Sequence, residues 1–175
     1  GNAYVSSSSP SAVYKVSPQA EIETIDVGTL SPRDIVVGKD DSVYVLDRTT
    51  RILKITPDGN QTVIASGVSG NQLRLEIDAS DRLYVMTGNG LSRINNDGSV
   101  VELFSDELIN EPFGIAVDSQ GRIYISSHRN SSIEVIENGI SRSFYSGIRG
   151  PRGIAVDEIL RNYNTYLHTL FLFHL

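Results

Sequence analysis

The sequence has 175 residues, 39% of them hydrophobic, and a formal charge of −6, so it is long enough to bury the core of one domain. The acidic balance argues against a nucleic-acid partner, because nucleic-acid affinity rests mostly on neutralising phosphate charges. The absence of cysteine excludes disulfides, a thiol nucleophile and a thiolate metal site, and no apolar run is long enough to span a bilayer. We therefore predict no cofactor and no membrane partner, while the composition leaves the compartment open.

One segment recurs at a constant step along the chain. Tyr4, Tyr44, Tyr84 and Tyr124 are spaced 40 residues apart. A period of roughly 40 residues made of short strands is typical of a β-propeller blade. The sequence predicts a partial blade, three full blades, the first strand of another blade and a non-repeat tail at 1–30, 31–70, 71–110, 111–150, 151–157 and 158–175.

Each full repeat is expected to form four antiparallel strands. In the last full copy, Ile115 and Val117 alternate in the first strand, and Tyr124 lies in the second. A third alternating strand is followed by Asn138-Gly139, a pair suited to the positive φ angles of a primed hairpin turn. Regular turns and the absence of helical periodicity before the tail indicate an all-β fold.

The repeated tyrosines and aspartates have structural explanations. An aromatic residue at a fixed repeat position is expected to pack between neighbouring blades, as predicted for Tyr44, Tyr84 and Tyr124. Asp78 and Asp118 end the first strand of their copies. We interpret them as turn caps rather than metal ligands, because Asp favours the first position of a turn and accepts bonds from backbone N–H groups.

The segment from Pro112 to Tyr124 closely resembles the NHL repeat family, as does the shorter segment from Pro151 to Asp157. The shared pattern is proline, any residue, glycine, aliphatic residues, aspartate, a glycine turn and a strand with an aromatic. This resemblance implies a propeller, usually six-bladed. Similar chains are ligand-sensing extracellular domains, protein- or RNA-binding modules and, occasionally, lyases or lactonases.

Two architectures remain open. The strand at 154–156 would complete the partial N-terminal blade and close a four-bladed ring, or the chain is an open fragment of a six-bladed ring, which the resemblance favours. A fragment would self-associate through its open blade edges. Neither the metal-binding set of gluconolactonase-type enzymes nor the tryptophan- and histidine-rich motifs of cyclic-peptide lyases can be aligned here.

The repeat pattern ends at Asp157, and the tail follows a different spacing. Its apolar positions fit a helix: Tyr166, Leu167, Leu170, Phe171 and His174. The tail is either a packed C-terminal element or an end that arose from a truncated or shifted reading frame. We expect deletion of 159–175 to leave the strands intact.

Blade topology predicts which loops share a face. Loops that lead into first strands should lie beside loops that join second and third strands, and such loops commonly carry binding residues. The residues predicted to bind are Arg33, Arg74, Glu76, Phe113, His128, Arg129 and Arg152. The alternative is a mixed surface on which the arginines pair with acids such as Asp47 and Glu111. Lys39 and Arg122 are expected on the opposite face.

Two functions follow. The first is a non-enzymatic recognition scaffold that binds a protein, peptide or glycan on the arginine-bearing face. The second is a lactonase- or lyase-like enzyme with a polar site at the central channel, where Glu76 would act as a ligand or general base.

Overall fold

The computed structural model describes residues 1–28, 31–68, 74–87, 90–105, 109 and 111–157, together with the backbone of 170–171. The chain divides into two compact units, Gly1–Ser69 with Asn96–Ser99 and Gly70–Asn95 with Val100–Leu175. All regular structure in the described residues is β-strand, so the all-β prediction is confirmed. This described part also has no apolar helix of the length needed to cross a membrane.

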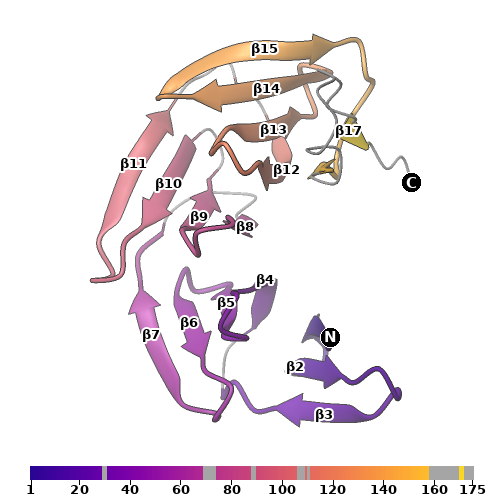
Figure 1. The fold of residues 1–175 in the computed structure, drawn as a ribbon, viewed down its shortest axis with the longest axis vertical. Coiled ribbons are helices and arrows are strands. Elements are labelled where there is room, and N and C mark those ends of the chain that lie inside the picture. Colours follow the sequence, from indigo (N-terminus) through magenta and orange to yellow (C-terminus); the bar gives the residue numbers. More distant parts are fainter. Residues whose placement is uncertain are drawn as a thin grey trace. The chain divides into compact units, whose positions relative to one another are not determined.

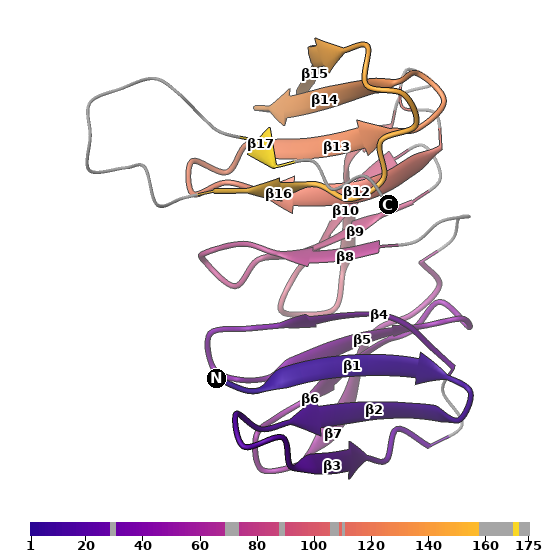
Figure 2. The same ribbon diagram turned by 90° about the vertical axis from the view of Figure 1, so that its right-hand side faces the viewer.

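The first unit contains two antiparallel sheets (Figure 1). Three strands form the first sheet in sequence order: β1 (Ala3–Ser8), β2 (Ser11–Val16) and β3 (Ile22–Ile25). Four strands form the second: β4 (Pro32–Val37), β5 (Val43–Asp47), β6 (Ile52–Ile55) and β7 (Gln61–Ala65). Strand β1 lies beside β4, which brings the two sheets together (Figure 2).

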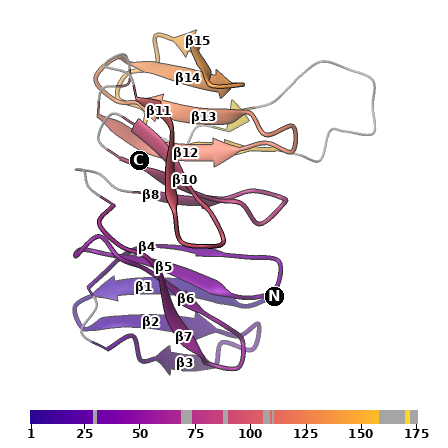
Figure 3. The ribbon, with the colours of Figure 1, turned by 90° about the vertical axis from the view of Figure 1, so that its left-hand side faces the viewer.

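The second unit contains two four-stranded sheets and a short strand pair. The four-stranded sheets, again in sequence order, are β8 (Arg74–Ile77), β9 (Leu83–Met86), β10 (Gly90–Ile94) and β11 (Val100–Ser105), then β12 (Pro112–Val117), β13 (Ile123–Ser127), β14 (Ser132–Glu137) and β15 (Ile140–Ser146). Strand β8 lies beside β12, so the first strands of consecutive repeats are neighbours (Figure 3).

The strand pair corrects the helical reading of the tail. β16 (Ala155–Val156) pairs antiparallel with β17 (Leu170–Phe171). The helical prediction is therefore wrong for Leu170 and Phe171, because spacing alone cannot separate a helix from a strand in a short apolar run. The other predicted helix positions, Tyr166, Leu167 and His174, lie outside the described residues.

Hairpin turns follow the third strand of each full repeat, as predicted, but their backbones differ. Asn138 and Gly139 both have positive φ, 53° and 76°, which fits the predicted primed turn. In the other two copies only the glycine is left-handed, with φ of 86° at Gly59 and 81° at Gly98. The primed-turn prediction is therefore correct for one hairpin of the three.

The repeated tyrosines join neighbouring sheets. Tyr84 belongs to the same buried cluster as Ile115, Ile123 and Ile136 of the next sheet. Tyr124 packs on the hydrophobic residues around β16 and meets Phe144 edge-on, with the ring centroids 5.3 Å apart. The prediction that tyrosines pack between blades is confirmed for both.

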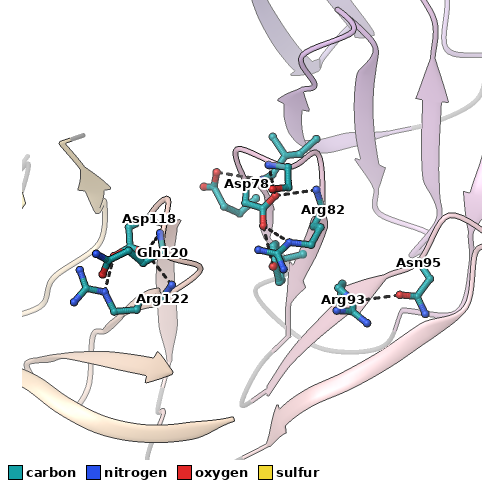
Figure 4. Close-up of polar contacts among 11 residues, drawn as sticks. Asp78, Arg82, Arg93, Asn95, Asp118, Gln120 and Arg122 are labelled. Atoms are coloured by element: carbon teal, nitrogen blue, oxygen red, sulfur yellow. Dashed lines mark hydrogen bonds and ion pairs between the residues drawn. The ribbon is translucent and has the colours of Figure 1, made fainter. Parts of the chain in front are cut away.

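An aspartate clasps the turn between the first and second strands (Figure 4). Oδ1 of Asp78 accepts bonds from the backbone N–H groups of Ser80 and Arg82, at 2.8 Å and 3.0 Å. Oδ2 accepts from Arg82 Nε at 2.6 Å and from the Tyr84 hydroxyl at 3.1 Å. Asp118 makes the equivalent bonds one repeat later, so the turn-cap interpretation is confirmed.

The clasp changes how Asp78 titrates. Burial alone would raise the pKa of this carboxyl, but the bonds from Arg82, Ser80 and Tyr84 outweigh burial and hold the pKa below its usual value. A lowered pKa in the folded state stabilises the protein at pH values above the unfolded pKa of about 3.9. That stabilisation is lost as the pH falls through the folded pKa.

A Pro-x-Gly motif allows close approach between repeats. A Cβ built on Gly114 would lie inside contact distance of the Arg152 carbonyl oxygen, and 3.1 Å from Ile154 Cγ2. Gly153 has the same place in the next copy of the motif, yet a Cβ there would meet nothing within 4 Å. The glycine is therefore a steric requirement at the first position only.

The first prediction compares these two glycines. Gly114→Ala should lower the free energy of unfolding by about 1–3 kcal/mol, because the backbone of residues 151–154 has to move away. Gly153→Ala, the matched control, should change it by less than about 0.5 kcal/mol. Urea unfolding followed by circular dichroism measures both, and equal losses would contradict the packing described.

A second prediction concerns the clasp. Asp78→Asn should lower the free energy of unfolding at pH 7 by about 1–3 kcal/mol, because the amide has lost the charge that Arg82 and buried Tyr84 bond to. The difference from the unmodified protein should shrink as the pH falls below about 3.9, because this carboxyl is then protonated in the unfolded wild-type chain, and at still lower pH also in the folded one.

Asp81→Asn, in the same hairpin, is the control for removing a charge, and asparagine accepts the left-handed φ of 58° there. Urea unfolding at pH 7 and pH 3 measures each variant. A pH-independent loss in Asp78→Asn would show that its charge is not what stabilises the turn.

Candidate binding site

The first strand of two repeats carries a β-bulge at the residue after the proline. In β12 the register skips Phe113, because Pro112 and Gly114 pair with consecutive residues of β13. In β4 the register skips Arg33 in the same way. A bulge bends the strand and redirects a side chain. The side chain of the residue after the proline therefore does not follow the alternation between the two faces of the sheet.

Three predicted binding residues meet around the ring of Phe113. The guanidinium carbon of Arg152 lies over this ring, 4.8 Å from its centroid. The imidazole of His128 lies 5.1 Å from the same centroid, with the two planes inclined at 58°. Cation–π attraction favours an arginine in this position. One aromatic ring therefore holds both a cation and a histidine at the ends of strands β12 and β13.

Glu111 joins a fourth predicted residue to this group. Its Oε2 is 3.6 Å from His128 Nδ1, and its Oε1 is 2.9 Å from Arg129 Nε. Its backbone is left-handed, with φ of 51°, and its carbonyl accepts a bond from the His128 N–H at 3.0 Å. We refer to Glu111, Phe113, His128, Arg129 and Arg152 as the entrance cluster.

The backbone beneath the entrance cluster is fixed by buried Ser126. Its Oγ accepts a bond from the Gly114 N–H at 2.9 Å and donates one to the Arg152 carbonyl at 2.7 Å. Gly150, with φ of 58°, lies against the histidine, since a Cβ there would be 3.1 Å from His128 Nε2. Contacts with the main chain thus position both Arg152 and His128.

The first unit repeats the loop arrangement without the aromatic. The Arg48 N–H donates to the Ser31 carbonyl at 3.0 Å, as His128 does to Glu111. The prediction that entrance loops lie beside the loops joining second and third strands is therefore confirmed in both units. Arg33 is exposed at the bulge of this unit.

Buried Asp47 neutralises an arginine near this loop. Its carboxylate accepts bonds from Arg51 N and Nε, both at 2.9 Å, and from the Thr49 hydroxyl at 2.8 Å. Burial alone would raise the pKa of Asp47, but these bonds outweigh it and lower the pKa. The alternative that arginines pair with neighbouring acids is confirmed for Arg51 and for Arg129.

Arg74 and Glu76 lie on β8, outside the entrance cluster. Their register partners are Met86 and Tyr84, so both side chains lie on the face of the sheet that carries the tyrosine. Glu76 is partly buried, and its Oε1 accepts a bond from the Ile77 N–H at 3.2 Å. Within the described ranges, no three His, Asp or Glu side chains converge to hold a metal ion.

Solved structures share this arrangement of sheets, whereas no protein-family model and no curated protein matches the sequence. A streptogramin B lyase has a TM-score of 0.76 at 18% identity, over 90% of this chain and 56% of that one. Virginiamycin B lyase from Staphylococcus aureus has 0.75 at 17% identity, over 89% and 56%. A nidogen/laminin complex gives 0.75 at 19% identity, over 89% and 64%.

The chain is a β-propeller. The predicted fold class of four-stranded antiparallel blades is thus confirmed. Identities below 20% show the fold alone. The chain spans little more than half the length of the two lyases, 56% in each case.

Sequence reasoning missed part of the support for the entrance cluster. Glu111 was expected only as a surface counter-charge, and Ser126 and Gly150 were not singled out. The two serines that end the strand at 123–127 were the available signal, because a buried hydroxyl requires a hydrogen-bond partner. Nothing in the spacing of the repeat indicated which backbone groups that hydroxyl would join.

A third prediction follows from this bridge. Ser126→Ala should lower the free energy of unfolding by about 1–3 kcal/mol, because it leaves the Gly114 N–H and the Arg152 carbonyl without their hydroxyl partner. Ser143→Ala, at an exposed position of β15, is the control and should have little effect. Thermal and urea unfolding measure both, and a neutral Ser126→Ala would contradict the bridging role.

Proposed function

We propose that this chain is a propeller of the NHL-repeat type that acts as a non-enzymatic recognition module. The proposed ligand is a protein or peptide, bound on the face formed by the entrance loops and the loops joining second and third strands. The observation that supports this most is the exposed Arg152 held over Phe113. A nidogen/laminin complex among the structural neighbours is consistent with protein binding by this fold.

A glycan is the weaker candidate ligand. Sugar rings pack on open aromatic faces, and the ring of Phe113 already has Arg152 over it and His128 against it. A peptide suits this site better than a glycan, because the guanidinium of arginine presents two parallel N–H donors that match a carboxylate group.

One observation favours a second candidate, a lyase- or lactonase-like enzyme. His128 and Glu111 form a histidine–carboxylate pair with 3.6 Å between Nδ1 and Oε2, and such pairs serve as general bases. Virginiamycin B and streptogramin B lyases are among the structural neighbours. Under this alternative Glu76 would lie in the central channel. His128→Asn would then abolish turnover of a substrate, whereas a recognition module has no turnover to lose.

The fourth prediction tests the binding face. Peptides selected from a random phage-displayed library on the unmodified protein should bind at least one of the single variants Arg33→Glu and Arg152→Glu at least about tenfold more weakly. The melting temperature should hardly change, because both arginines are exposed and surface ion pairs are worth at most about 1 kcal/mol.

The control for that prediction has to be Lys39→Glu alone. Arg122, the other residue expected to serve as a neutral control, bonds buried Asp118 through Nε at 2.6 Å, so reversing its charge would damage the fold. Undiminished binding of the selected peptides to both single variants, or failure to select any peptide, would reject the proposed binding face.

A further inference from the structure

We propose that the partner segment is an acidic peptide, whose carboxylate binds Arg152 while an adjacent apolar side chain packs beside Phe113. This rests on the proposed function and specifies its ligand chemistry. Three observations carry the inference: the state of Arg152, the pairing of the surrounding arginines and the charge around the entrance cluster.

The exposure and the restraint of the Arg152 guanidinium favour the binding of an anionic ligand. Its side chain is exposed. Among the described residues, no carboxylate oxygen lies within 4.0 Å of its guanidinium nitrogens, the distance that defines an ion pair. Phe113 holds the guanidinium from one side, and Ser126 holds the backbone carbonyl at 2.7 Å. A guanidinium restrained in this way loses less conformational entropy when it binds a carboxylate.

Several other arginines of the described repeats have acidic partners. Arg51, Arg82 and Arg122 each donate through Nε to an aspartate of their own turn, at 2.6–2.9 Å. Arg129, the other arginine of the entrance cluster, donates to Glu111. Beside Arg152 an aromatic ring takes the place of the acid, and no acid of the described residues pairs with its guanidinium.

The surrounding charge favours a single carboxylate over a polyanion. Glu111 is part of the entrance cluster, and the whole chain carries a formal charge of −6. Nucleic-acid binding requires several phosphates to be neutralised together, and the entrance cluster offers a single arginine, Arg152, that pairs with no acid of the described residues. The partly buried ring of Phe113 adds apolar surface for a neighbouring side chain of a peptide.

The test uses three labelled synthetic peptides of one sequence that differ only in carrying glutamate, glutamine or lysine beside a single phenylalanine. Fluorescence anisotropy at physiological salt measures their binding to the full chain. The glutamate peptide should bind at least about tenfold more tightly than its glutamine isostere, and the lysine peptide more weakly still. Arg152→Gln should abolish the preference for glutamate, and Arg152→Lys should keep only part of it, since lysine lacks the bidentate fork.

Arg142→Gln is the matched control. It removes the same charge from the same unit at an exposed position, 3.7 Å from Glu137 on an adjacent strand. It should leave the preference for glutamate unchanged, and all variants should unfold at the same temperature as the unmodified protein. Equal binding of the glutamate and glutamine peptides, or equal losses in Arg142→Gln and Arg152→Gln, would overturn the proposal.

The failure of this inference can be told apart from the failure of the proposed function. Library peptides that bind through Arg33 or Arg152 without enrichment in acidic residues would sustain the function and overturn the acidic ligand. Absence of binding by both the library and the synthetic peptides would reject both. Tight, Arg152-dependent binding of a labelled single-stranded RNA oligonucleotide would also overturn the acidic peptide.

Discussion

The blades of this propeller depend on a carboxylate that closes the turn between their first two strands. A turn leaves backbone N–H groups without strand partners, and Asp78 and Asp118 each satisfy two of them. The same carboxylates orient an arginine and a buried tyrosine hydroxyl. Because that tyrosine packs against the next sheet, the turn and the contact between sheets are stabilised by one group. The aspartate of a single turn, which the sequence shows locally, therefore also stabilises the packing between sheets.

The blade at 31–70 uses other residues for the same purpose. Gly38 occupies the aspartate position, and its N–H bonds the Ser42 carbonyl to close the turn. The carboxylate comes from Asp40, which bonds Ser42 and is 3.2 Å from Lys54 Nζ. The ammonium group of Lys54 lies over the Tyr44 ring, 5.4 Å from its centroid. The physical requirement, a charge network around the tyrosine, is therefore kept although the motif is not.

The sequence predicted the features that recur in each repeat and missed the contacts that occur at only one place. Strands, buried tyrosines and turn caps recur every 40 residues, so each copy supports the reading of the others. The contacts of Phe113 with Arg152 and His128 occur in one place and join residues up to 39 positions apart, which no local pattern encodes. The bulge that redirects Phe113 was missed because two-residue alternation has no place for an unpaired residue. The short strand β17 was misread for a related reason, since its pairing with β16 is non-local.

The bulge also explains how one fold can present different side chains at the same place in successive repeats. The residue after the proline has no register partner in β4 or β12, so its side chain contributes little to sheet pairing. The residue after the proline is Arg33 in one repeat, Phe113 in another and Arg152 in the segment before β16. The positions on either side of it are fixed by packing and hydrogen bonds. Substitution at this position changes the chemistry of the entrance loops at low cost in stability. At the successive positions Phe113 and Arg152 the aromatic and the cation stack, and among the described residues no acid pairs with the charge that this stack positions.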